Sequence, residues 1–184
     1  MSENTIYLDS VNEWIKNVVI GLNFCPFARK PYEAKTVRIT CHDHLLEHDD
    51  ILKLVLEELI RLEEASRENL ETTLIVLPKA FPDFNDFNDF LYVLNDVLFH
   101  EGLEGIFQIA SFHPAYQFAD TDTNDVGNYT NRSPYPILHL IREDSIEEAL
   151  EKHPDPDNIP YQNIAKLNQL TEKQLKQYFS YLYR

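Results

Sequence analysis

The sequence predicts a single α/β domain, a sandwich in which helices flank a mixed sheet of about four strands, three parallel and one antiparallel. Helical and strand patterns alternate along the chain, which is typical of strand–helix–strand units with parallel strands. A fourth strand pattern follows a long loop and most simply returns antiparallel to one of the first three. The chain shows no repeat and no low-complexity linker, so one domain is expected over residues 1–184.

The first predicted element is a helix over residues 11–20. Ser10 and Glu13 have the spacing of a capping box, and apolar residues recur after Ser10 with a helical period. Gly21 would supply the left-handed residue that commonly ends a helix. The apolar segment 22–28 contains a proline, so we expect it to form a turn under the body of the protein.

The next segments predict a strand, a helix and a second strand. Residues 36–41 alternate apolar and polar side chains, the pattern of a half-buried strand near a sheet edge. Asp49 or Asp50 is expected to cap a helix that runs to about Ser66 with one apolar face. Residues 74–77 are apolar on both faces, as an interior parallel strand should be.

The second half of the chain continues this alternation. Asp83 is expected to cap a helix that a pair of glycines ends, and residues 106–112 then form a third strand. Residues 137–141 form the fourth strand. Two further capping-box patterns, which begin at Ser145 and Thr171, predict a helical C-terminal quarter.

Composition limits the partners and the compartment. The apolar content of 43% and the charged content of 26% are those of a globular protein. A net charge of −15 would repel nucleic acids and anionic membrane surfaces, so neither is expected as a partner. No signal peptide or transmembrane run is visible, which predicts a cytoplasmic protein with Cys25 and Cys41 reduced. No pattern indicates an oligomeric state.

The most informative segment is the loop over residues 113–135. It has no helical or strand period, yet it is rich in aromatic residues, which disordered segments lack. Connections of this length are functional or disordered, so we expect an ordered, functional loop. In α/β sheets, ligands bind beyond the carboxyl ends of parallel strands. Residues 41–44, 78–79 and 113–114 should all reach that edge, and the loop should fold over it.

Arg132 is the first candidate for ligand binding in this loop. Its planar, permanently charged fork suits a carboxylate or a phosphate. Asn128, Asn131 and Ser133 would add neutral hydrogen-bonding groups beside it. An alternative stays open, in which Arg132 pairs with the aspartates of the loop and only pins it in place.

Two residues are candidates for catalysis. His113 would move a proton with a pKa near neutrality, or would only hydrogen-bond the carbonyls of the loop. Cys25 would be a nucleophile if its pKa were depressed, or a small buried hydrophobe between its phenylalanine neighbours. His139 lies in an otherwise apolar strand and is expected to be a core histidine. Arg142 ends that strand and is expected to cap or to form an ion pair.

No metal or cofactor is specified by a motif. Residues 120–131 begin like an EF-hand calcium loop but lack its glycine at the sixth position and its glutamate at the twelfth. Residues 41–48 carry cysteine and histidine without a recognised zinc spacing. Phosphate loops and dinucleotide-binding glycine motifs are absent from the sequence.

Three motifs together resemble a bacterial family of single-domain proteins of unknown function. They are GLNFCPFA at 21–28, FHPAYQF at 112–118 and NRSPYPILHLIRE at 131–143. The likeness covers nearly the whole chain, but the family has no assigned activity, so the resemblance implies motif positions and no mechanism. It gives weight to Cys25, because the family pattern places a thiol there, and none to Cys41.

The function expected from these residues is an enzyme that acts on a small anionic metabolite. Arg132 would hold its phosphate or carboxylate, and His113 would move a proton. Tyr116 and Asn131 would orient the substrate, and Cys25 would be the nucleophile if one is needed. Two alternatives stay open: a non-catalytic ligand-binding or regulatory module that uses the same pocket, and a protein–protein adaptor that docks through the aromatic loop.

Overall fold

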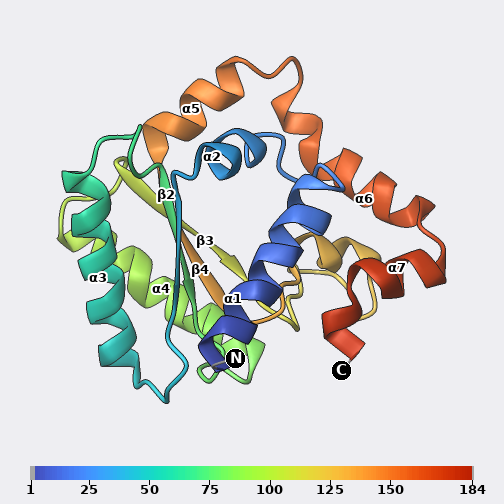
Figure 1. The fold of residues 1–184 in the computed structure, drawn as a ribbon, viewed down its shortest axis with the longest axis horizontal. Helices are drawn as coiled ribbons and strands as arrows, with labels where there is room; N and C mark the ends of the chain where they lie inside the picture. Colours follow the sequence, from blue (N-terminus) through green and yellow to red (C-terminus); the bar gives the residue numbers. More distant parts are fainter. Residues whose placement is uncertain (1–2, 184) are drawn as a thin grey trace.

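A computed structural model describes residues 3–183, which form a four-stranded sheet between two layers of helices (Figure 1). The strands are β1 (Val37–Cys41), β2 (Thr72–Val76), β3 (Phe107–Phe112) and β4 (Ile137–Arg142). The α-helices are α1 (Glu3–Trp14), α2 (Arg29–Ala34), α3 (His48–Glu64), α4 (Phe84–His100), α5 (Glu143–Glu151), α6 (Ile159–Gln169) and α7 (Glu172–Tyr178). A π-helix, η1 (Ile15–Ile20), continues α1, and a 3-10 helix, η2 (Val126–Asn131), lies between β3 and β4.

The order of the strands corrects the prediction of three parallel strands. The sheet order is β1-β2-β4-β3, in which β1 pairs parallel with β2, and β4 pairs antiparallel with both β2 and β3. Apolarity on both faces explains the central place of β4, because Leu138 and Leu140 are fully buried on one face and Ile137 on the other. The long connection before β4 lets it return between β2 and β3. The carboxyl ends of β1, β2 and β3 still lie at one edge, since β2 and β3 both run opposite to β4.

The first layer of helices consists of α3 and α4. Asp83 caps α4, because its carboxylate accepts hydrogen bonds from the backbone N–H groups of Asn85 and Asp86, as predicted. Glu47 and Asp50 form a capping box at the start of α3, so the cap lies just before the two aspartates that the sequence suggested. The two helices bury an apolar stripe against one face of the sheet, made by Ile51, Val55, Leu59, Leu62, Phe87, Leu94 and Leu98.

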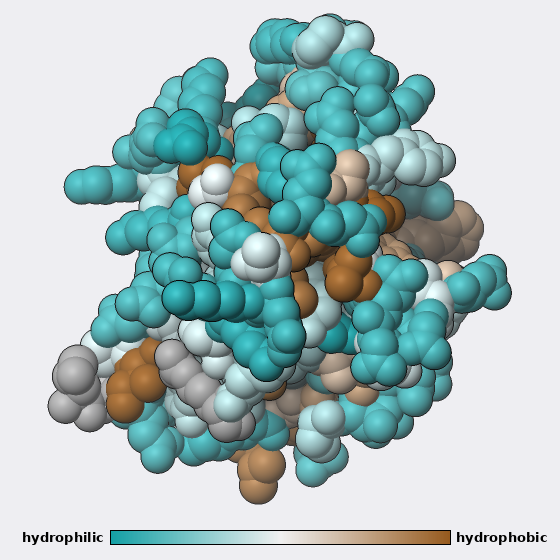
Figure 2. All heavy atoms as spheres, turned by 90° about the vertical axis from the view of Figure 1, so that its right-hand side faces the viewer, coloured by the Kyte–Doolittle hydropathy of each residue, from teal (hydrophilic) through white to brown (hydrophobic). Residues whose placement is uncertain are grey.

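The second layer covers the other face of the sheet. It is made by α1 and η1, the segment 22–28, α6 and the residues that follow α7. Trp14, Val18, Leu167 and Phe179 are buried in this second core. The face of the molecule turned to the viewer in Figure 2 is mostly hydrophilic, and its hydrophobic side chains gather near the centre.

The predicted start of the first helix is wrong, whereas its predicted end at residue 20 matches the end of η1. The first helix begins at Glu3, so Ser10 and Glu13 lie inside it and cap nothing. Gly21 has a right-handed φ of −66°, and the left-handed residue that follows the helix is Asn23, with a φ of 54°. The reason for the wrong start is that the helical hydrogen bonds continue through the N-terminal position that the local pattern suggested.

The C-terminal capping boxes have different outcomes. Thr171 and Gln174 form the predicted box at the start of α7. Ser145 does not cap α5, because this helix starts directly at Glu143 after the last residue of β4. No helix among residues 3–183 has the length and apolar character that would be needed to cross a bilayer.

Candidate functional site

The loop over residues 113–135 is held by its own hydrogen bonds. Asn128 is fully buried, and its side-chain oxygen accepts from the Phe118 N–H at 3.0 Å and from the Thr121 hydroxyl at 3.0 Å. Its side-chain NH2 donates to the Asp122 carbonyl at 2.9 Å. Both the oxygen and the NH2 group of the Asn128 side chain are therefore hydrogen-bonded within the loop, and these bonds hold its shape.

Arg132 pins the same loop through backbone carbonyls. Its Nε donates to the Tyr116 carbonyl at 3.2 Å, and its Nη2 donates to the Thr123 carbonyl at 2.8 Å. The guanidinium carbon lies 4.6 Å from the centre of the Tyr129 ring. Within the described part of the chain, no carboxylate lies within ion-pair distance of Arg132, and its Nη1 makes no hydrogen bond. Arg132 therefore pins the loop, as in the second of the two interpretations of this residue, but it does so through backbone carbonyls and not through aspartates.

His113 ties the loop to the connection between β2 and α4. Its Nδ1 accepts from the Ala115 N–H at 3.0 Å, so Nε2 carries the proton and donates to the Phe81 carbonyl at 2.9 Å. The rings of Phe84 and Phe87 lie 5.5 Å and 5.4 Å from the imidazole. This burial lowers the pKa of His113, so the ring is neutral and both its nitrogens are occupied.

The remaining candidates of the loop are also engaged inside the protein. Asn131 donates from its side chain to the Ser111 carbonyl at 3.2 Å, and Ser133 donates to the Tyr135 carbonyl. The hydroxyl of Tyr116 bonds the side chains of Ser111 and Asn131, and burial raises the pKa of this phenol. The polar groups predicted to surround a ligand thus surround one another.

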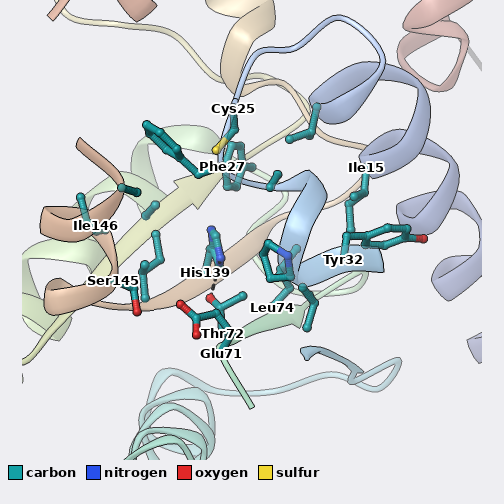
Figure 3. Close-up of a pocket in the computed structure, with 18 of the residues that line it drawn as sticks. Ile15, Cys25, Phe27, Tyr32, Glu71, Thr72, Leu74, His139, Ser145 and Ile146 are labelled. Carbon is teal, nitrogen blue, oxygen red and sulfur yellow. Dashed lines mark hydrogen bonds between the residues drawn. The ribbon is translucent and has the colours of Figure 1, made fainter. Parts of the chain in front are cut away.

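A different hollow, of about 270 Å³, lies on the opposite face of the sheet from α3 and α4 (Figure 3). All four strands form its floor, and its walls come from α1 with η1, from residues 25–32 and from α5. Most of its lining is apolar, including Trp14, Ile15, Leu74, Ala110, Phe112, Ile141 and Ile146. We refer to this hollow below as the sheet pocket.

The sheet pocket exists because the second layer covers β3 and β4 incompletely. Leu138 and Leu140, which face α3 and α4, are fully buried. Ala110, His139 and Ile141 point to the other face and are only partly buried, because they line the pocket. The α5 helix starts directly at the end of β4, at the top of the sheet in Figure 1. Its residues Ser145, Ile146 and Ala149 line one wall of the pocket.

His139 stands in the middle of the sheet pocket, with Thr72 below it and Cys25 above it in Figure 3. Its Nε2 lies 2.8 Å from the Thr72 hydroxyl oxygen, which itself lies 2.5 Å from the Leu140 carbonyl. A carbonyl has no proton, so Thr72 donates to Leu140 and accepts from Nε2–H of His139. Burial among apolar side chains lowers the pKa of His139 to about 4, so the imidazole is neutral at pH 7.

The other ring nitrogen of His139 is free. Among residues 3–183, Nδ1 has no hydrogen-bond partner, and it is open to the pocket. The sequence predicted a core histidine whose ring nitrogens are both hydrogen-bonded. In the structure of the described residues, only Nε2 has a partner. The alternation of β4 could have placed this side chain on the less covered face, but no local pattern reveals that the face stays open.

Cys25 lines the same pocket from the opposite wall. The chain before it is fixed by α6, where Asn163 donates to the Phe24 carbonyl at 2.8 Å and Lys166 donates to the Leu22 carbonyl. Burial raises the pKa of the Cys25 thiol, which keeps it protonated at neutral pH. The condition on which the sequence analysis made it a nucleophile, a depressed pKa, is therefore not met.

The predicted catalytic residues are not brought together. Cys25 lies over the face of the sheet that α1 covers, whereas His113 packs against α4 on the other face. The sheet pocket is lined by neither His113 nor Arg132. Arg142 caps the C-terminal end of α3, because its guanidinium donates to the carbonyls of Leu62 and Ala65.

The sheet pocket is bordered by a π-helix, η1, and the sequence did not predict this helix type. Ile15 and Val19 of η1 line the pocket, and the Val19 carbonyl accepts from the Phe24 N–H at 2.9 Å. Short π-helical turns inside helices occur frequently at functional sites. The apolar period of this helix continues unbroken through η1, so its sequence carried no sign of the wider turn.

The segment 41–48 shows no metal geometry. The rings of His42 and His44 lie 6.4 Å apart, and residues 3–183 contain no cluster of three or more metal-ligating side chains. Burial raises the pKa of Cys41 to about 11 and lowers the pKa of His42. The Cys41 thiol is therefore protonated at neutral pH.

A family model described as "Protein of unknown function (DUF1415)" matches residues 7–177. No curated protein and no solved structure matches the chain.

Proposed function

Because the chain belongs to the DUF1415 family, whose function is unknown, we propose a function from the site alone: the protein binds a small, predominantly apolar molecule in the sheet pocket. The observation that carries this proposal is the open, apolar face of β3 and β4, with one unpaired imidazole nitrogen in it. Largely apolar pockets with few polar groups are the usual form of small-molecule sites.

The size of the sheet pocket sets the size of the ligand. Its volume of about 270 Å³ exceeds that of an engineered apolar cavity of ~150 Å³ that binds benzene. It is slightly below the ~300 Å³ at which typical ligand sites begin. The pocket therefore suits a molecule of about one or two rings, or an aliphatic chain of similar volume.

The charge of the lining argues against an anionic ligand here. The described lining contains no arginine or lysine, and its one charged residue, Glu71, is ion-paired with Arg67 at 3.4 Å. A carboxylate or phosphate in this pocket would lose its hydration without gaining a cation. A neutral ligand avoids this cost.

The state of the polar groups supports binding more than catalysis. The Cys25 thiol is protonated, and His139 is a weak base because its pKa is lowered. A nucleophile is activated by a neighbouring base or by a lowered pKa, whereas burial raises the pKa of Cys25. We therefore favour the ligand-binding or regulatory module that the sequence analysis kept as an alternative.

The anionic metabolite stays a second candidate at Arg132. The observation in its favour is a buried guanidinium with no carboxylate within ion-pair distance in the described part of the chain. Titration with inorganic phosphate, followed by NMR, tests it. Saturable shifts in residues 113–135 that disappear in Arg132→Gln would support an anion site, and their absence would remove it.

The main proposal is tested by titrating the protein with p-xylene and following backbone amide shifts. Ala110→Phe would fill the pocket from the floor and Ala149→Phe from the α5 wall. The matched control is Ala119→Phe, the same substitution at an exposed loop position. We expect saturable binding in the wild type and in the control, and loss of binding in both filled variants.

Two results would contradict the proposal. One is the absence of saturable p-xylene binding to a folded wild type. The other is unchanged affinity in Ala110→Phe and Ala149→Phe, which would place the bound molecule elsewhere on the protein. The use of two positions, one on the floor and one on the α5 wall, keeps the test valid if one variant folds poorly.

A further inference from the structure

The hydrogen bonds of Thr72 fix the proton of His139 on one nitrogen. A neutral imidazole carries one donor and one acceptor nitrogen. The contact of 2.5 Å between the Thr72 hydroxyl and the Leu140 carbonyl uses the only proton that this hydroxyl has. Thr72 can therefore only accept from His139, at 2.8 Å, and Nε2 must be the protonated nitrogen.

The opposite tautomer would lose this arrangement. It would place the lone pair of Nε2 against the oxygen of Thr72, whose proton is already committed to Leu140. Thr72 is 7% exposed and Leu140 is fully buried, so water cannot readily replace either bond. The imidazolium form, which would donate from both nitrogens, is disfavoured by the apolar lining.

The free Nδ1 consequently faces the sheet pocket as an acceptor without a proton to give. Most of the surrounding lining is apolar, from Leu74, Ala110, Phe112 and Ile141. A ligand group that donates a hydrogen bond gains a partner at this point. A group that only accepts would meet a second lone pair and would lose its own water.

From this geometry we propose that the sheet pocket selects apolar molecules that carry a hydrogen-bond donor, such as a phenol or an alcohol, whose O–H donates to Nδ1 of His139. Ketones, ethers and other acceptor-only molecules of the same shape are rejected. This selectivity rests on the proposed function, because it assumes that small molecules enter the pocket. Thr72 acts as the positioning residue, and His139 makes the contact.

The test compares p-cresol with p-xylene, which has the same shape and no donor, and with acetophenone, which only accepts. Their affinities are measured by calorimetry or NMR in the wild type, in His139→Phe and in Thr72→Val. His139→Phe should weaken p-cresol relative to p-xylene by about tenfold, the factor of roughly one hydrogen bond. His139→Leu repeats the test if the phenylalanine overfills the pocket.

Thr72→Val tests the positioning role. Without the hydroxyl, the imidazole can carry its proton on Nδ1, so acetophenone should gain affinity relative to p-cresol. Thr73→Val is the matched control, because Thr73 is the next residue of β2, fully buried and directed to the layer of α3 and α4. This control should leave the ratio of affinities unchanged. A long-range 1H–15N spectrum of the wild type should show His139 protonated on Nε2.

The outcomes separate the two proposals. If p-xylene does not bind the wild type saturably, the proposed function fails. If both bind but His139→Phe and His139→Leu leave their ratio unchanged, the pocket is a site without donor selectivity and this inference is overturned. A proton on Nδ1 of His139 in the wild-type spectrum would overturn it as well.

Discussion

At the scale of single residues, polar side chains in this protein differ in whether all their hydrogen-bonding groups have partners within the chain. Asn128 and His113 hold the loop 113–135 through backbone groups. His139 makes one hydrogen bond, to Thr72, and its other ring nitrogen is directed to the sheet pocket. A side chain whose hydrogen-bonding groups are all paired stabilises the fold, whereas a side chain with an unpaired group is available to a ligand.

The low pKa of His139 predicts a specific loss of stability in acid. Its pKa is about 4 in the folded protein against an ordinary value of 6.5, so folding favours the neutral ring. The stabilisation is complete above pH ~6.5 and is lost progressively as the pH falls toward ~4, by up to about 3 kcal/mol.

Urea unfolding of the wild type and of His139→Gln between pH 7 and pH 4 measures this loss. His113, whose pKa is also lowered, is present in both proteins and cancels in the difference. The free energy of unfolding should fall more steeply in the wild type. Parallel curves would mean that the ring of His139 is not desolvated in the folded state.

Arg132 should contribute to stability through the loop. Replacing it in Arg132→Gln removes charged hydrogen bonds to the carbonyls of Tyr116 and Thr123, which should cost about 1–3 kcal/mol. The control Arg29→Gln removes an exposed ion pair with Glu33 and should change stability by less than ~0.5 kcal/mol. Equal stability of the two variants in urea unfolding would contradict the loop-pinning role.

The sequence identified candidate polar residues of the loop, but it did not identify their hydrogen-bond partners. The sequence placed Arg132 and His113 in an ordered loop because aromatic and polar residues share a segment without a period. It could not show that their bonds go to carbonyls of the same loop, because a hydrogen bond depends on backbone direction. The free nitrogen of His139 depends on Thr72, which lies on a different strand.

At the scale of elements, local patterns located most helices and strands but not all their ends. The stripes of α3 and α4 follow directly from the apolar period of the sequence. The capping-box pattern at Ser10 fails, because the helix continues through it to Glu3. A capping motif is a local preference, and here the helix continues through it, with Tyr7 of the extra turns packed against Tyr135.

The two N-terminal patterns can be compared directly by mutation. Asp83→Ala should destabilise the protein by about 0.5–2 kcal/mol, because two backbone N–H groups lose their acceptor. Ser10→Ala should be neutral or slightly stabilising, because this position is inside α1 and alanine favours helices. Thermal unfolding of both variants measures the contrast, and an equal loss in Ser10→Ala would return the start of the helix to Ser10.

At the scale of the whole molecule, the sheet pocket is a product of assembly. The sequence predicted an α/β sandwich with about four strands, since the alternation of patterns is readable along the chain. It did not predict that β4 enters between β2 and β3, nor that the second layer leaves part of the face of β3 and β4 open. Strand order and helix coverage depend on contacts between distant segments, which no local period records.

Ligand binding in the sheet pocket can be observed in a crystal of the protein soaked with p-cresol. We expect the ring of p-cresol in the sheet pocket, with its hydroxyl about 2.5–3.0 Å from Nδ1 of His139 and the bond from His139 to Thr72 intact. An empty pocket in crystals that hold p-cresol elsewhere, for example beside Arg132, would contradict it.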